Sequence, residues 1–218
     1  MATNAISDRI GDRPGDRAGD RLDDRVGDRM HSPYRFSVEQ YYRMAEVGVL
    51  APEARTELIE GEICDMPPTG CPHSVTVAWL HWQLSKAVGE RAWVVEQYPF
   101  RLSRHTEPQP DLMVLRSRRG LYWDAHPSAR DALLVIEVSD SSWCYDREVK
   151  MPLYASYGVQ ELWLVDIGVS ELSCYRAPHA GSFVEQTSTR APGSLLVPSL
   201  DVHVDLTQLF RLGDHSVS

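Results

Sequence analysis

The stretch "LLVIEVSDSSWCYDREVK", residues 133–150, joins an apolar strand pattern to the start of a helix. Its first four residues are leucine, valine and isoleucine, which is typical of a buried β-strand. Glu137 interrupts this apolar run, and Lys150 follows at the end of the stretch. Because a charge is costly to bury without a partner, the sequence predicts that Glu137 meets a cation in the folded protein.

A second carboxylate stands near the start of another predicted strand, "PDLMVLR", residues 110–116. If this strand pairs antiparallel with the strand at 133–139, Asp111 and Glu137 arrive at the same end of the sheet. Opposed side chains lie about 5 Å apart, where two anions repel unless a proton or a cation lies between them. A divalent ion removes this conflict, so the two acids predict a metal site.

The candidate ligands are oxygen atoms, which favours a hard ion such as Mg²⁺, with Mn²⁺ as an alternative. Lys150 begins a helical stripe with Leu153, Tyr154 and Tyr157, which aims its amine toward the sheet. A lysine beside two acids could orient a metal-bound water. Each residue also has a plain structural interpretation, as a turn aspartate, a strand-edge glutamate or a solvated lysine.

Length and composition bound the organisation of the chain. With 218 residues and 43% hydrophobic content, we expect one domain over 33–212, flanked by tails at 1–32 and 213–218. Residues 8–29 repeat a D-R-x-G unit that has too little apolar surface to fold, which predicts disorder. No run reaches the roughly 18 apolar residues of a membrane span, and no secretory signal is present, so we expect a cytoplasmic protein without membrane contact.

Charge and cysteine spacing exclude several classes of function. The net charge of −9 argues against a broad basic face that binds nucleic acid by counterion release, so any such role depends on a local site. The four cysteines form no C-x-x-C pair, which indicates neither a zinc site nor a disulfide framework.

Periodicity and turn signals predict a mixed order of elements. A capping box at Ser37 opens a helix that ends near Gly48, and a second helix begins near His73 with a buried stripe. The other predicted elements are a hairpin over 56–66 turning at Glu60-Gly61, strands at 92–102, 110–116, 133–139 and 160–167, a helix at 146–157 that breaks or restarts at Met151, and a final antiparallel pair, "ELSCYRA" and "SFVEQTS". This order predicts an α/β sandwich with a central mixed sheet flanked by helices, plus a β-hairpin extension.

The composite of "PD" at 110–111, Glu137 in "IEVS" and Lys150 after "YDREVK" resembles the PD-(D/E)XK nuclease superfamily. It is most similar to a bacterial family of restriction-endonuclease-like proteins, and the likeness covers about residues 34–178, including "TELIEGEI" and "PHSVTVAWL". The resemblance implies a restriction-endonuclease-like fold, Mg²⁺-dependent cleavage of phosphodiester bonds, and a nucleic-acid partner, most simply DNA.

The superfamily places its lysine two residues after the glutamate, where this chain has Ser139. The resemblance implies that the amine has moved to Lys150, and that the backbone carbonyl of Val138 is a further metal ligand. The superfamily often carries a further acidic residue on its first core helix, and the resemblance implies that Glu57 or His73 fills this role at the metal site here. The likeness of "ELIEGE" favours Glu57, and His73 is equally compatible with a structural role at the helix start.

Two other classes of function remain compatible with the sequence. One is a non-catalytic binding or regulatory module that keeps the nuclease fold, which metal titration would distinguish. The other is a structural protein that associates, as a homodimer for instance, through exposed aromatic residues. The loop at 117–132 carries Arg118 and Arg119 close to Tyr122 and Trp123, a pattern that predicts either a grip on nucleic acid or a loop packed by its own aromatics.

Overall fold

The computed structural model describes residues 32–51, 53–140 and 145–212. The chain divides into two units, Met1–Pro33 and Tyr34–Ser218, and the description below concerns the second. Apart from Ser32, the predicted tails lie outside the described residues, as does Cys144.

A six-stranded mixed sheet forms the centre of this unit, with strands in the order β3-β4-β5-β6-β7-β8. The strands are β3 (Ala92–Glu96), β4 (Leu112–Arg116), β5 (Ala132–Ser139), β6 (Glu161–Asp166), β7 (Glu171–His179) and β8 (Ser182–Thr189). β5 and β6 are parallel, and the other neighbouring pairs are antiparallel. The predicted α/β class with a central mixed sheet is therefore confirmed.

The parallel pair requires a crossover, and the crossover is the segment that carries Lys150. It consists of a π-helical turn, Asp146–Lys150, followed by α4 (Met151–Ser156). Pro152 stands in the first turn of α4, where its missing N–H costs no intrahelical hydrogen bond. The predicted restart at Met151 is confirmed.

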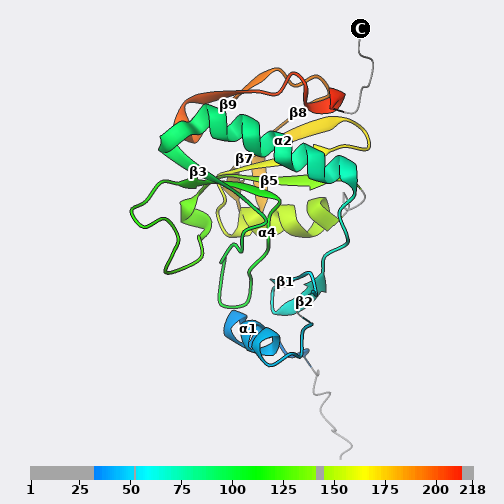
Figure 1. The fold of residues 1–218 in the computed structure, drawn as a ribbon, viewed down its shortest axis with the longest axis vertical. Helices are drawn as coiled ribbons and strands as arrows, with labels where there is room; N and C mark the ends of the chain where they lie inside the picture. The colour runs from blue at the N-terminus through cyan, green and yellow to red at the C-terminus, as the bar shows by residue number, and fades with distance from the viewer. Residues whose placement is uncertain (1–31, 52, 141–144, 213–218) are drawn as a thin grey trace, which may run out of the picture. The chain divides into compact units, whose positions relative to one another are not determined.

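Helices cover both faces of the sheet, with α2 (Cys71–Val88) on one side and α4 on the other (Figure 1). The predicted stripe of α2 packs into the core beside Leu112 and Ile136. Residues of that stripe are Val77, Leu80, Leu84 and Val88. On the opposite face, Tyr154 of α4 packs with Met113 and Val135. α2 begins at Cys71, earlier than predicted, because Pro72 is well suited to a first helical turn.

An extension below the sheet contains α1 (Val38–Glu46) and the hairpin β1 (Thr56–Ile59) and β2 (Glu62–Asp65) (Figure 1). The capping box between Ser37 and Gln40 is present, as predicted. The hairpin turns at Glu60 and Gly61, whose φ angles of 49° and 81° suit a tight turn. A Cβ atom on Gly61 would lie 2.6 Å from Cβ of Arg35, so the turn requires glycine.

The predicted strand at 92–102 is wrong beyond Glu96. Gln97 adopts a left-handed φ of 45°, and Pro99 has no N–H for a ladder. The chain leaves the sheet and doubles back, with Leu102 N–H donating to the Thr106 carbonyl at 3.0 Å. The returning limb pairs with β1 through Leu58 and Glu107 before β4 begins at Leu112, later than the predicted start at 110.

A second hairpin was not predicted. It comprises β9 (Ser194–Val197) and β10 (Val202–Asp205), and Val197 and Val204 pack into the core that α2 also contacts. Short helical turns complete the described chain at Gly89–Arg91, Ala129–Asp131, Pro198–Leu200 and Leu209–Arg211. No helix in the described residues is long and apolar enough to cross a membrane.

Candidate active site

The antiparallel pairing of β4 and β5 brings the two predicted acids together. Leu112 lies opposite Ile136, so the next pair along the ladder is Asp111 and Glu137. The Asp111 N–H donates to Glu137 Oε2 at 3.4 Å, and the Val138 N–H donates to Asp111 Oδ2 at 2.8 Å. Both carboxylates and the backbone of Val138 therefore meet at one end of the sheet.

Lys150 reaches the same point from the π-helical turn. Its Nζ atom lies 3.2 Å from Glu137 Oε1 and 3.5 Å from Glu57 Oε2. The residue is only 6% exposed. Burial by itself would lower the pKa of Lys150, but the nearby carboxylates of Glu137 and Glu57 outweigh burial and raise it. The amine predicted from the resemblance is thus a buried cation between two acids.

Glu57 and Glu60 belong to one hairpin but face different surroundings. Glu57 is buried on β1, where its Oε2 accepts the Gln109 N–H at 3.2 Å and contacts Lys150. Glu60 instead accepts from the hydroxyl of Tyr157 at 2.9 Å, on the outside. The expectation that only one of the two faces the site, and that it is Glu57, agrees with this placement.

His73, near the start of α2, also faces the site. Its Nε2 lies 3.1 Å from Asp111 Oδ2. Burial would lower the pKa of His73, but the hydrogen bond and charge of Asp111 raise it. The structure therefore places both Glu57 and His73 in the site, on opposite sides: Glu57 contacts Lys150, and His73 contacts Asp111.

Tyr154 is a site residue that sequence reasoning missed. Its hydroxyl donates to Glu137 Oε1 at 2.6 Å, and both side chains are buried. Burial raises the pKa of Glu137, although the charge of Lys150 opposes this effect. The signal was available, because Tyr154 follows Lys150 by one helical turn on the same stripe.

Ser139 occupies the position at which the superfamily carries its lysine. Its hydroxyl donates to the carboxylate of Asp146, the first residue of the π-helical turn, and both residues are buried. This hydrogen bond ties the end of β5 to the turn that carries Lys150. The position thus serves to hold the turn, while the amine comes from Lys150.

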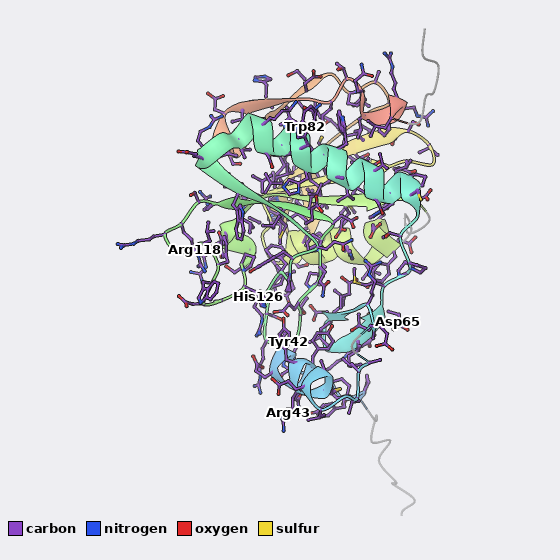
Figure 2. All side chains as sticks on the ribbon, in the orientation of Figure 1. Tyr42, Arg43, Asp65, Trp82, Arg118 and His126 are labelled. Atoms are coloured by element: carbon purple, nitrogen blue, oxygen red, sulfur yellow. The ribbon has the colours of Figure 1, made fainter. Side chains whose placement is uncertain are left out.

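A cavity of about 510 Å³ is lined by the acids, the amine and the imidazole described above, which are Glu57, His73, Asp111, Glu137 and Lys150. Its acidic side chains are Glu57, Asp65, Asp111, Glu137, Asp140 and Asp146, and its basic ones are Arg55, His73 and Lys150. Carboxylates outnumber cations, so the cavity as a whole favours a positively charged ligand. Asp65, labelled in Figure 2, is the last residue of β2, opposite Thr56 in the hairpin, and belongs to neither β4 nor β5.

The donor atoms fit a hard divalent ion. In the described part of the chain, the contacts of the Asp111 carboxylate use Oδ2, which leaves Oδ1 for a ligand. No group of three or more His, Cys, Asp or Glu side chains among the described residues is arranged to hold an ion alone. An ion held by Asp111, Glu137 and the Val138 carbonyl would take its other ligands from water or substrate, as Mg²⁺ commonly does.

The fold and this site define a restriction-endonuclease-like α/β protein. A family model described as "Putative restriction endonuclease" (Uma2) matches residues 38–209, and the chain belongs to this family. The family is one of nucleases by its description, which supports a nuclease role for this chain.

A solved structure shares the fold at low sequence identity. It is described as a "putative nuclease belonging to DUF820" from Anabaena variabilis, and it is 18% identical with a TM-score of 0.63. The match covers 81% of this chain and 98% of that one. No curated protein matches the chain.

Proposed function

We propose that the protein is a Mg²⁺-dependent endonuclease that cleaves DNA at the cavity formed by β4, β5 and the π-helical turn. The observation that carries the proposal is that three charged groups meet at one point. Lys150 Nζ lies 3.2 Å from Glu137 Oε1, and the register of β4 and β5 places Glu137 next to Asp111. Two acids that can hold a divalent ion, beside an amine that can contact a phosphate, form an arrangement that suits metal-dependent phosphodiester hydrolysis.

Asp111 and Glu137 would hold the ion through their carboxylates, with the Val138 carbonyl as a further ligand. When bound, the ion supplies a positive centre that polarises a phosphate and offsets the charge that develops on it. Mn²⁺ has the same preference for oxygen ligands and is expected to substitute for Mg²⁺.

Lys150 would orient the attacking water and donate hydrogen bonds to phosphate oxygens. With Glu137 and Glu57 both within 3.5 Å, the amine keeps its proton. It therefore acts as a hydrogen-bond donor and a fixed positive charge. A group other than Lys150 accepts the proton of the attacking water. Glu57 holds Lys150 in place, and His73 fixes the orientation of Asp111.

A cleavage assay tests this proposal. The full-length protein is incubated with supercoiled, linear and single-stranded DNA in Mg²⁺, in Mn²⁺ and in EDTA, beside Asp111→Asn and Glu137→Gln. We expect cleavage with either metal, none in EDTA, and a loss of at least about a hundredfold in both variants.

A control variant separates the site from the general acidity of the cavity. Asp65→Asn removes an acid from the same cavity but not from the proposed ion site, so it should keep activity within a few-fold of the wild type. Cleavage that persists in Asp111→Asn would assign the activity to a contaminant. No cleavage of any substrate by the wild type with either metal would favour a non-catalytic binding module.

A further inference from the structure

A second cavity of about 510 Å³ lies outside the site described above. Its lining includes Tyr98, Arg101, Tyr122, Trp123 and His126. These residues come from two segments, the chain that leaves β3 and the loop between β4 and β5. Nothing in the proposed hydrolysis uses this cavity.

The wall of this cavity is an ordered aromatic cluster. Tyr122 stacks on Trp93 of β3, with ring centres 5.9 Å apart and planes within 6°. Tyr98 meets Trp93 edge to face, and its ring centre lies 5.5 Å from that of His126. Because Trp93 belongs to the sheet, the cluster is held rigidly and can present flat apolar surface to a ligand.

Trp123 stands at this wall and is 92% exposed. A single exposed apolar side chain needs no explanation, but one that borders an aromatic cavity offers its ring to a ligand there. His126 also borders the cavity, and its Nε2 lies 3.2 Å from the Tyr42 hydroxyl, which fixes the position of the ring.

The charges at the cavity favour a neutral, flat ligand over a phosphate group. Arg101 donates to Glu107 at 2.8 Å and to Glu39 at 2.9 Å, so two carboxylates already neutralise it. Arg118 lies 4.0 Å above the Tyr122 ring and donates to the carbonyls of Leu121 and Ala125. This placement agrees with the predicted alternative of a loop packed by its own aromatics, while the predicted grip of this loop on nucleic acid stays a prediction.

One chain segment contacts lining residues of both cavities. Glu107 anchors Arg101 in the aromatic cavity, and its backbone pairs with Leu58 of β1. Gln109, two positions further, donates its N–H to Glu57 in the acidic cavity. Two extended residues span about 7 Å, so a short segment of chain links lining residues of the two cavities.

We propose that the aromatic cavity binds an unpaired nucleobase of the substrate strand, stacked against Trp123 and flanked by Tyr98 and His126. The inference rests on the proposed nuclease function and adds a preference for single-stranded or locally unpaired substrates. Stacking suits this wall because every base has a flat π-face, and such binding needs no extra positive charge.

Binding without cleavage tests the inference. The full-length protein, in EDTA, is titrated into fluorescently labelled dT20 and into an abasic oligomer of the same length, with anisotropy as the readout. We expect wild-type protein to prefer dT20, and Trp123→Ala to weaken dT20 binding about tenfold while leaving the abasic oligomer unchanged. Trp123→Phe, which keeps an aromatic ring, should restore most of the affinity.

Trp82 provides a matched control. It is also exposed, at 56%, and Lys86 Nζ lies 3.4 Å from the centre of its ring. It lies on α2, across the sheet from Arg118 and His126 (Figure 2). Trp82→Ala should therefore leave dT20 binding unchanged. Because Trp123 is almost wholly exposed, its removal should also leave the circular dichroism spectrum unchanged.

Three results would overturn the inference. These are equal dT20 affinity in Trp123→Ala and wild type, an equal loss for dT20 and the abasic oligomer, and competition by thymidine monophosphate at the affinity of dT20. The last result would assign the cavity to free nucleotides. Cleavage measured on the same proteins separates the two proposals: cleavage with no role for Trp123 refutes only the inference, and base-dependent binding with no cleavage refutes only the nuclease.

Discussion

Replacing Lys150 by methionine tests the electrostatic structure of the site through folding stability. The substitution keeps the length of the side chain and removes the cation that contacts Glu137 at 3.2 Å and Glu57 at 3.5 Å. At an effective dielectric constant of about 20, Coulomb's law gives each pair about 5 kcal/mol of attraction. The cost of removing the charged groups from water offsets much of this gain.

The net loss of folding stability in Lys150→Met depends on the carboxyl groups that remain buried after the substitution. Glu57 and Glu137 stay buried without their cation, and breaking a buried pair in this way costs about 3–5 kcal/mol. For a chain of this size, the melting temperature should fall by about 10 °C. Urea denaturation in EDTA, followed by far-ultraviolet circular dichroism, measures the change in the free energy of unfolding.

Two further variants make the reasoning refutable. Lys150→Met combined with Glu137→Gln removes one of the stranded charges, so it should recover at least half of the lost stability. Lys86→Met removes a lysine that lies over Trp82 at the surface and should cost about 1 kcal/mol or less. A loss below about 1 kcal/mol in Lys150→Met, or no recovery in the double variant, would refute a buried cation held between two acids.

Three further substitutions probe the parts that position the site. Tyr154→Phe removes the hydroxyl that donates to Glu137 and should cost about 1.5–3 kcal/mol in urea denaturation, the range for a bond to a charged group. Gly61→Ala should cost about 1–3 kcal/mol, because the turn has a positive φ and the new Cβ would meet Arg35; a melting temperature equal to the wild type would contradict this. Ser139→Ala, which frees the π-helical turn from β5, should lower kcat for cleavage while leaving dT20 affinity unchanged, and a wild-type kcat would remove Ser139 from the positioning of Lys150.

The strand pattern and its period predicted the acidic pair from the sequence. Asp111 stands at the start of one apolar run and Glu137 near the end of the other, so antiparallel pairing alone brings them together, and the structure has this register. The position of Lys150 could not be predicted from strand pairing. Helical spacing predicted that it points toward the sheet, and only the family resemblance predicted that it lies beside Glu137. Residues at fixed positions in regular elements were thus the predictable part of the site.

The remaining parts depend on the tertiary path of irregular segments. After Glu96 the chain leaves the sheet at a left-handed Gln97, and a single such residue has no reliable signal in an apolar, aromatic run. The contacts of Glu57 depend on that path, since the returning limb at Glu107 and Gln109 holds β1 in place. The partners of Arg118 could not be predicted for the same reason: its charge was visible in the sequence, but its carbonyl partners were not.

Calorimetric titration of the DNA-free protein with Mn²⁺ tests the central claim most directly. We predict one ion per chain, with binding abolished in Asp111→Asn and in Glu137→Gln and retained in Asp65→Asn. Binding heat that is unchanged in Asp111→Asn, or absent from the wild type, would contradict an ion held between Asp111 and Glu137.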